Sequence, residues 1–428
     1  MFKLFKYLLV IVLLLFIVVV GVFLFALEST PILKTQSAQQ VNQAESVKRL
    51  MTQISDSVKN KDSKQKIAIT ENQLNSLVGF AQRAHKPIQG QVKINPDSSQ
   101  LLASYALPSN PFGRYINIDI VVKPGNGVIV EHVNVGPFSI PGNLALSTVV
   151  TLANWYTNSD IAKQFVDQVE SVAMSKKKLV LSVRPLDHFL KELKLVKQNV
   201  DGGDKELRQR TAFYLRELTM FEVSHKTTPQ SLAKFMGPLF SIVKQRSTFD
   251  TAAKENEAAI MALAIYAGHY RFANFVGDVQ PVKGQIAVPS AIPMLGFRND
   301  LNQHFIFSAA IKIISEQGLS IAIGEFKELM DRGEGGSGYS FIDLAADVAG
   351  VEFAISATDP NTALKLQEVL AGQTTESNFF PSLKGLPEGL NKTEFTEQFS
   401  EVDSPAYSQM VTEINRRVSS LPIHNVLE

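Results

Sequence analysis

The sequence predicts an α+β protein in three parts: an N-terminal transmembrane helix, a small domain built on an antiparallel sheet, and a mainly helical domain. Three observations support this fold class. The chain opens with an uncharged apolar run, strand-like segments dominate up to about residue 186, and helical periodicity dominates the rest. The predicted parts are a signal anchor (1–30), a polar stalk or first helix (31–65), the α+β domain (66–186) and the helical domain (187–428).

Tyr7 to Leu27 contains no charged residue and is dense in Leu, Val, Ile and Phe. As a helix it would reach about 31 Å, enough to cross the hydrocarbon core of a bilayer. A secretory signal peptide is the competing interpretation, but its apolar region is usually shorter and ends at a small-residue cleavage site. Lys3 and Lys6 precede the run and Glu28 follows it, which predicts a cytoplasmic N-terminus and an extracytoplasmic remainder.

Composition narrows the function classes. There are 42 Lys and Arg residues against 41 Asp and Glu residues, so the net charge is +1 and no basic field points to nucleic acid. There is no cysteine, which excludes disulfides, thiolate metal sites and a lipoprotein anchor. We therefore expect a bacterial inner-membrane, single-pass protein whose domains face the periplasm or the cell exterior.

Near the start of the α+β domain, the capping box Thr70-Glu-Asn-Gln73 predicts the beginning of a helix. Alternating segments at 89–94, 101–107, 115–122 and 128–135 follow as strands of an antiparallel sheet. Residues 123–127 predict a hairpin turn, and 136–142 predict a break in the sheet. Two helices, 144–156 and a second ending at Met174, then precede a strand at 179–183.

This region resembles the YpmS-like membrane-anchored extracytoplasmic domains. The resemblance rests on the Thr-x-x-Gln-Leu-Asn text of Thr70 to Asn75 and on the turn between Gly136 and Pro141. It implies an anchored ectodomain and no catalytic residues. An apolar inner sheet face that carries a lipid tail is one hypothesis for this domain. A scaffold or interaction module is the other.

The helical domain includes an almost apolar stretch, Ala252 to Tyr270, which is too short to span a bilayer and predicts a buried core helix. His269 at its end is expected to cap helix carbonyls. A loop or extended hairpin is predicted for 275–298, and a further helix for Tyr407 to Arg417. His424 is expected to be exposed.

Ionisable residues cluster between Asp300 and Gly350, within apolar and small-residue helical text. Asp300 and His304 are four apart, Glu328 and Asp331 three apart, and Asp343 and Asp347 four apart, so each pair shares a helix face. Convergence of the three helices would form a pocket. Its candidate metal ligands are Asp300, His304, Glu328, Asp331, Asp343 and Asp347. Imidazole with carboxylates suits Zn, Mn or Fe(II), and carboxylates alone suit Mg or Ca.

A His–carboxylate network that only locks three helices together is the competing interpretation of this cluster. Glu325 and Lys327 are expected to face solvent. Gly335-Gly-Ser-Gly338 is expected to form a turn.

The order Asp300-x-x-x-His304, Glu328, then Asp343-Leu-Ala-Ala-Asp347-x-x-Gly350 is similar to the YfiM-like envelope lipoproteins and, more distantly, to the VanZ-like membrane proteins. Leu301 stands where those families carry Lys. The resemblance implies an envelope setting and, for the VanZ-like proteins, a link to glycopeptide-antibiotic resistance. It implies no established reaction.

Two functions follow as hypotheses. The first is a binding or assembly role in the cell envelope, with the bilayer, an envelope protein, a lipid or a cell-wall ligand as partner. The alternative is a metal-assisted hydrolase or transferase acting on a cell-wall or lipid-linked substrate. In that case His304, Glu328 and Asp347 are the candidate catalytic residues, with Glu328 or Asp347 as base and His304 as ligand or acid. A divalent metal is the expected cofactor of this alternative only, and the sequence leaves open whether the protein is an enzyme.

Overall fold

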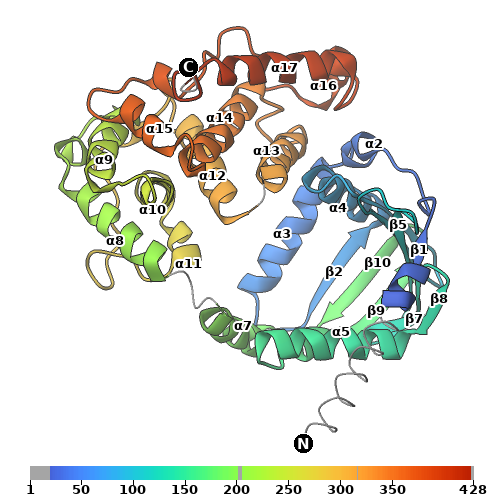
Figure 1. The fold of residues 1–428 in the computed structure, drawn as a ribbon. Coiled ribbons are helices and arrows are strands. Elements are labelled where there is room, and N and C mark those ends of the chain that lie inside the picture. The colour runs from blue at the N-terminus through green and yellow to red at the C-terminus, as the bar shows by residue number, and fades with distance from the viewer. Residues whose placement is uncertain (1–19, 201–204, 316, 426–428) are drawn as a thin grey trace, which may run out of the picture. The chain divides into compact units, whose positions relative to one another are not determined.

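A computed structural model describes residues 20–200, 205–315 and 317–425 and divides the chain into two compact units between Val196 and Lys197 (Figure 1). We call them the sheet unit and the helical unit. The division falls ten residues after the predicted domain boundary at 186. Helix α7 (Asp187–Val200) accounts for the difference, because Phe189 packs on Phe165 of the preceding helix, with ring centroids 6.1 Å apart. Most of α7 thus belongs to the sheet unit.

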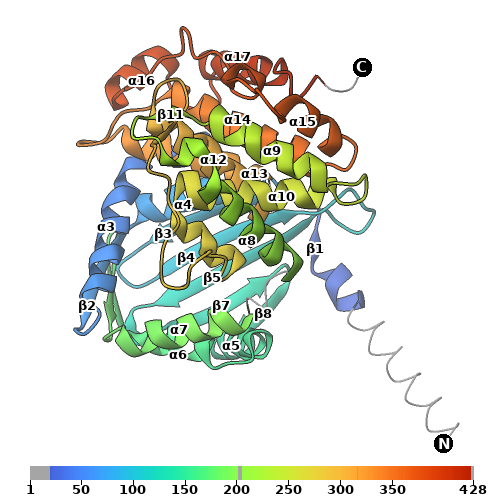
Figure 2. The same cartoon turned by 90° about the vertical axis from the view of Figure 1, so that its left-hand side faces the viewer.

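The sheet unit contains two antiparallel sheets (Figures 1 and 2). One has the order β3-β4-β5-β7-β8, with β1 also paired to β5, and the other has the order β2-β10-β9-β6. The strands are β1 (Leu27–Glu28), β2 (Gln65–Thr70), β3 (Ile88–Ile94), β4 (Ser99–Ala106), β5 (Tyr115–Lys123), β6 (Gly125–Asn126), β7 (Ile129–Val135), β8 (Phe138–Pro141), β9 (Val169–Ser175) and β10 (Lys178–Val183). The helices before α7 are α2 (Ser37–Val41), α3 (Glu45–Lys59), α4 (Glu71–Ala84), α5 (Gly142–Thr157) and α6 (Ile161–Gln168).

The capping box at the start of α4 is confirmed. The Thr70 side chain accepts a hydrogen bond from the Gln73 backbone, and the Gln73 side chain accepts one from Thr70 N. Asn75 then fixes the helix to strand β3, because its amide both donates to Val92 O and accepts from Val92 N at 2.8 Å. A core that includes Val92, Ile94 and Leu179 lies beneath this helix.

The structure does not support the transmembrane helix in the predicted fold class. No helix within residues 20–200, 205–315 and 317–425 combines the length and the apolar character that a bilayer crossing requires. Residues 7–19 of the predicted span lie outside the described residues. At its other end, residues 20–25 are helical, but Ala26 is only 7% exposed and Leu27 pairs with Ile116 of β5. The fold class is therefore corrected to α+β, because the described residues do not support the predicted transmembrane helix. Burial at this end of the apolar run is confined to Ala26 and Leu27, since Val22, Phe23 and Phe25 are 47–68% exposed.

The hairpin predicted at residues 123–127 is confirmed, because this segment joins β5 to β7 and the two strands pair antiparallel, with Lys123 opposite Ile129. Within the turn, Gly125–Asn126 also pairs with β9 of the other sheet as β6. Two other local predictions in the sheet unit are wrong. Residues 138–141 form strand β8 against β7 instead of ending the sheet. Met174 lies in strand β9, paired with Leu179, and not in a helix. In each case strand pairing overrode a local turn or helix signal.

The helical unit is built around α10 (Ala252–Leu263), whose apolar residues are buried as the sequence predicts. Its last turn widens into a π-helical segment, Ala264–Gly268. His269 differs from its predicted role, because it accepts a hydrogen bond from Arg271 N and so begins the next turn. The other helices are α8 (Lys205–Met220), α9 (Ala233–Arg246), α11 (Ala273–Val276), α12 (Asn299–Ile314), α13 (Gln317–Asp331), α14 (Phe341–Thr358), α15 (Ala363–Leu370), α16 (Lys392–Phe399) and α17 (Pro405–Ser419).

Residues 277–298 form mostly irregular chain, as the sequence predicts, with one short strand, β12 (Pro293–Met294). β12 pairs in parallel with β11 (Gln230–Ser231). This pairing fixes the chain just before α12, the first helix of the candidate site.

Candidate functional site

Helices α12 and α14 approach each other closely because α14 presents small residues to α12. At Gly350 an added Cβ would lie 2.0 Å from the carbonyl oxygen of Phe305, so a larger residue cannot be accommodated without movement of the backbone. This contact brings His304 of α12 beside Asp347 of α14. The His304 Nδ1 and Asp347 Oδ1 atoms are 3.1 Å apart.

Asp347 is buried and interacts with two residues of α12. Besides His304, the Ser308 hydroxyl donates to Asp347 Oδ1 over 2.7 Å. Ser308 lies one turn after His304, so both side chains point from the same face of the helix. The other oxygen, Asp347 Oδ2, is buried without a hydrogen bond from any described residue. An added Cβ at Gly324 of α13 would lie 2.5 Å from this oxygen, so the glycine leaves room for the carboxylate.

Asp343 lies in the first turn of α14, one turn before Asp347. The Ser340 hydroxyl caps the helix by accepting a hydrogen bond from Asp343 N. Asp343 Oδ2 lies 3.4 Å from His304 Nε2, so the imidazole is held between two carboxylates. Asp343 Oδ1 is buried and accepts no hydrogen bond from the part of the chain that the structure describes, although Arg298 Nη2 lies 3.5 Å away.

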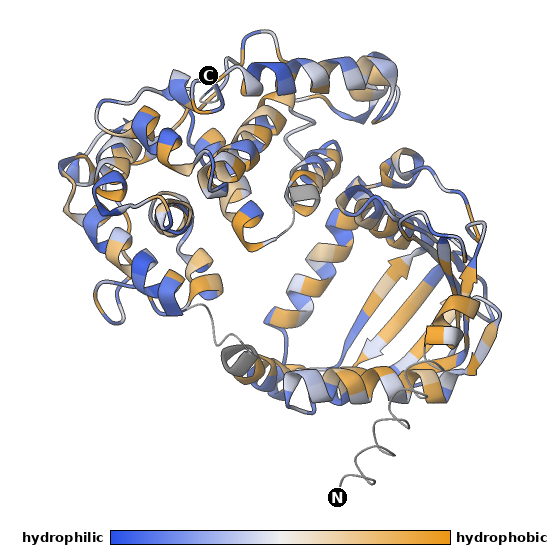
Figure 3. Cartoon of the chain, in the orientation of Figure 1, coloured by the Kyte–Doolittle hydropathy of each residue, from blue (hydrophilic) through white to orange (hydrophobic). Residues whose placement is uncertain are grey.

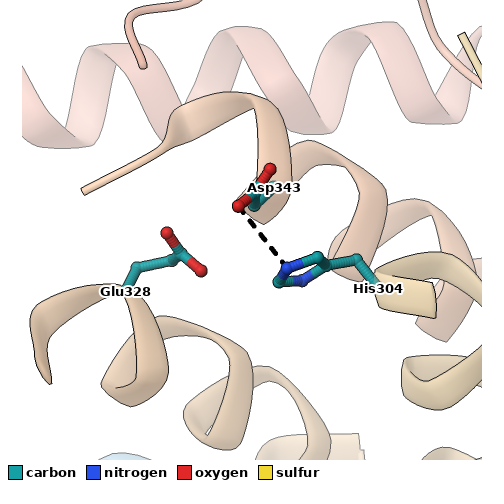
Figure 4. Close-up of side chains that lie close together, drawn as sticks. All are labelled: His304, Glu328 and Asp343. Atoms are coloured by element: carbon teal, nitrogen blue, oxygen red, sulfur yellow. Dashed lines mark ion pairs between the residues drawn. The ribbon is translucent and has the colours of Figure 1, made fainter. Parts of the chain in front are cut away.

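Helix α13 contributes Glu328, which is fully buried. Its Oε2 accepts a hydrogen bond from Ser340 N over 3.0 Å, and its Oε1 lies 2.8 Å from Lys327 Nζ. Figure 4 shows Glu328, Asp343 and His304 pointing toward one another from three different helices. One ligand atom from each residue lies within 4.8 Å of the other two, which is the spacing of groups that share one metal ion.

A cavity of about 430 Å³ opens at this cluster. Its wall is chemically divided. His304, Asp343 and Asp347 form a polar part together with the Ser308 and Ser340 hydroxyls, while Phe307, Ile311 and Ile323 form an apolar part. Four carboxylates line the cavity against two basic side chains besides His304, and this acidic excess favours a bound cation. The remaining lining residues are Arg298, Asp300, Gln303, Gly324, Lys327, Ser337 and Glu388.

Burial shifts the protonation of the cluster. It raises the pKa of Glu328 from 4.5 to about 7, although the nearby Lys327 ammonium opposes the shift. Burial raises the pKa of Asp343 as well, against the charges of His304, Lys327 and Arg298. For His304 burial lowers the pKa, but the hydrogen bond and charge of Asp347 outweigh it, so the net pKa is raised. The cluster therefore holds protons near neutral pH that a metal ion would replace.

The structure places the six predicted ligands in two groups. His304, Asp343 and Asp347 line the cavity, and Glu328 lies buried close to His304 and Asp343. Asp300 is half exposed and pairs with Arg298, whose guanidinium lowers the pKa of Asp300. Asp331 lies 3.1 Å from Lys327 Nζ and is likewise away from the imidazole.

Sequence reasoning missed some residues around the cluster and misplaced others. Ser340 had a readable signal, because Ser340-Phe-Ile-Asp343 is a helix-start pattern. Ser308 and Arg298 had none, since their roles depend on which helices pack together. Glu325 was predicted to face solvent, which is wrong: it is buried and accepts a hydrogen bond from the Tyr407 hydroxyl. Lys327 is partly exposed but lines the cavity.

His424 was also predicted to be exposed, and this prediction is wrong. Its ring is half-buried, and Nδ1 lies 2.8 Å from the Ser356 hydroxyl of α14. Burial lowers the pKa of His424 to about 4. The C-terminal segment thus packs on α14, which no local pattern indicated.

The stability of the protein should fall as pH rises through the cluster's titration. Glu328 holds its proton in the folded chain up to about pH 7 but loses it near pH 4.5 when unfolded, so the folded form is progressively disfavoured between these values. The cost above pH 7 is on the order of 3 kcal/mol. The raised pKa of His304 acts in the same direction, because its stabilising charge is lost as pH rises through the folded pKa.

Glu328→Gln is therefore expected to flatten this decline and to leave the protein at least as stable as wild type at pH 8. Urea denaturation followed by circular dichroism from pH 5 to 8, without divalent cations, measures both. Glu397→Gln, at an exposed position of α16, is the matched control and should retain the wild-type slope. An unchanged slope in Glu328→Gln would show that Glu328 does not carry the buried proton.

Comparison with protein-family models, with curated proteins and with solved structures finds no match to this chain. The resemblances noted in the sequence therefore stay predictions, and the site is interpreted from its own geometry.

Proposed function

We propose that the helical unit binds a divalent metal ion, with His304, Glu328 and Asp343 as its ligands. The observation that carries this proposal is the meeting of one imidazole nitrogen and two carboxylates, from three helices, within 4.8 Å. Such buried acids are costly unless they are paired with a cation or hold protons. The acidic excess along the cavity supports a cation.

Asp347 acts as a positioning residue in this proposal. Its bond to His304 Nδ1 fixes that nitrogen as the protonated one and leaves Nε2, which faces Asp343, to bind the metal. A carboxylate behind a ligating histidine is the usual outer-shell partner in metal sites, and it also raises the basicity of the ring. Ser308 holds the same Asp347 oxygen in place.

The ligand set favours Zn²⁺, Mn²⁺ or Fe²⁺ over Mg²⁺ or Ca²⁺. Imidazole is a good ligand for the first group, whereas the second group prefers oxygen ligands alone. Three protein ligands leave coordination positions for water or substrate, as in catalytic metal sites. The cavity provides room for a substrate beside them.

The reaction that these features support best is metal-assisted hydrolysis or group transfer. The apolar wall at Phe307, Ile311 and Ile323 favours a substrate with an apolar part next to the bond that reacts. A lipid-linked or cell-wall substrate outside the cytoplasm, as the sequence suggests, remains within this proposal.

A second candidate is a non-enzymatic role in which the cluster only holds the helices together. One observation favours it: both oxygens of Glu328 already have partners, Lys327 and the Ser340 backbone. In that case the cluster would not take up a metal ion, and its removal would destabilise the fold.

Calorimetric titration of the full-length protein with Zn²⁺ or Mn²⁺ distinguishes the two. At pH 6.5 binding should release roughly one to two protons per ion, because metal ligands must be deprotonated. Comparing the binding heat in buffers of different ionisation enthalpy gives the number of protons released. This number should be smaller at pH 8.5, because Glu328 is already ionised above its pKa of about 7. Absence of saturable heat with either ion, at both pH values, would exclude metal binding and favour the structural role.

A further inference from the structure

Helix α5 of the sheet unit exposes a continuous apolar stripe. Leu144, Val149, Leu152, Trp155 and Tyr156 are between 56% and 80% exposed, and Trp155 is the most exposed of them. At 100° per residue these five side chains lie within one sector of about 140°, and Thr148 is the one polar residue of α5 in that sector. Phe165 on the neighbouring helix α6 is 64% exposed as well. In Figure 3, α5 is coloured largely orange and pale along its length.

Helix α5 itself carries no formal charge. No Asp, Glu, Lys, Arg or His lies between His132 and Asp160, a stretch that includes strand β8 and all of α5. Surfaces that contact water or a polar protein rim usually carry charged residues, and an exposed helix without any is unusual. No charged group of α5 would have to be dehydrated if this face entered an apolar phase.

Several polar side chains of α5 form hydrogen bonds, most of them to the helix itself. The hydroxyls of Ser147, Thr151 and Thr157 donate to the carbonyl oxygens of Leu144, Ser147 and Ala153, at distances of 2.7–3.0 Å. Asn143 accepts a hydrogen bond from the backbone at the start of the helix, and Asn154 accepts one from Ala162 N. Hydrogen bonds of this kind lower the cost of bringing these polar groups against lipid, where fewer water molecules are present to accept or donate.

We propose that α5 lies along a lipid surface, with its apolar stripe in the layer between headgroups and acyl chains. Trp155 and Tyr156 occupy the end of the stripe, and these two residue types are enriched at that layer because their rings are apolar with one polar group. A helix about 24 Å long fits in the plane of the membrane and does not cross it.

Trp155 tests this proposal directly, because it is the single tryptophan of the chain. Full-length protein is mixed with phosphatidylcholine–phosphatidylglycerol vesicles, with and without bromine on the acyl chains. The emission should shift to shorter wavelength, and bromines near the carbonyl end of the chains should quench about half of the intensity, more than bromines near the terminal methyl. Attachment of the protein through another segment would not quench this ring.

Leu152→Glu places a charge in the stripe and keeps Trp155, so both the shift and the quenching should be lost. Asn143→Asp adds the same charge to α5 outside the stripe and should behave as wild type. Circular dichroism checks that both variants stay folded. Unchanged emission in vesicles, or quenching that survives Leu152→Glu, would overturn the proposal. A shift of the Trp155 emission that depends on protein concentration in the absence of lipid would also overturn the proposal. It would show that a second copy of the chain covers the stripe.

Discussion

His304→Ala is expected to lower the affinity of the protein for Zn²⁺ or Mn²⁺ by more than roughly 100-fold, beyond the 10–100-fold that loss of an outer-shell partner costs. The substitution removes the nitrogen ligand that Asp343 and Asp347 hold between them. Asp347→Asn keeps the three proposed ligands but weakens the orientation of the ring, so a loss of about 10–100-fold is expected. Calorimetric titration at pH 7.5 measures both values.

His225→Ala and Asp250→Asn are the matched controls, because both positions are exposed in the same unit. Neither should change the metal affinity. If wild type and His304→Ala, both folded, bound the metal ion with equal affinity, His304 would not be a metal ligand. A variant that loses metal binding together with its circular dichroism signal would point to the structural role instead.

Gly350→Ala is expected to destabilise the protein by about 3 kcal/mol or more, although it adds a single methyl group in a helix. The added Cβ would meet the backbone carbonyl of Phe305 at 2.0 Å, and backbone cannot rotate away as a side chain can. Helices α12 and α14 would have to separate, which would also pull His304 from Asp347. Urea denaturation measures the stability, and metal titration measures the second effect.

Ala346→Gly is the reverse change at a buried position of the same helix. It should cost only about 1–2 kcal/mol, from lost helix propensity and one lost methyl group. If Gly350→Ala lowered the free energy of unfolding less than Ala346→Gly did, Gly350 of α14 could not be in close contact with the Phe305 backbone of α12.

Much of the site could be predicted from residue type and spacing. Asp343 and Asp347 are four apart in helical text, so they had to share a face once the segment folded as a helix. His304 stands in an apolar stretch, which indicated that its imidazole would be buried with its neighbours. Spacing alone did not show that Asp300 and Asp331 lie away from the His304 imidazole. Each is three or four residues from another predicted ligand on its own helix, as Asp343 is from Asp347. Their actual partners, Arg298 and Lys327, depend on how α12 and α13 are placed.

Local sequence thus determined the elements whose signals are contained within one turn or one strand. Examples are the capping box at Thr70, the alternating strands and the apolar helix α10. Tertiary structure decided the rest: the pairing of Leu27 in a sheet, the burial of Glu325 under Tyr407, and the convergence of three helices on one cavity. The physical reason is that apolar burial and strand pairing act between distant segments. The same apolar or charged residue can therefore satisfy several environments until packing selects one.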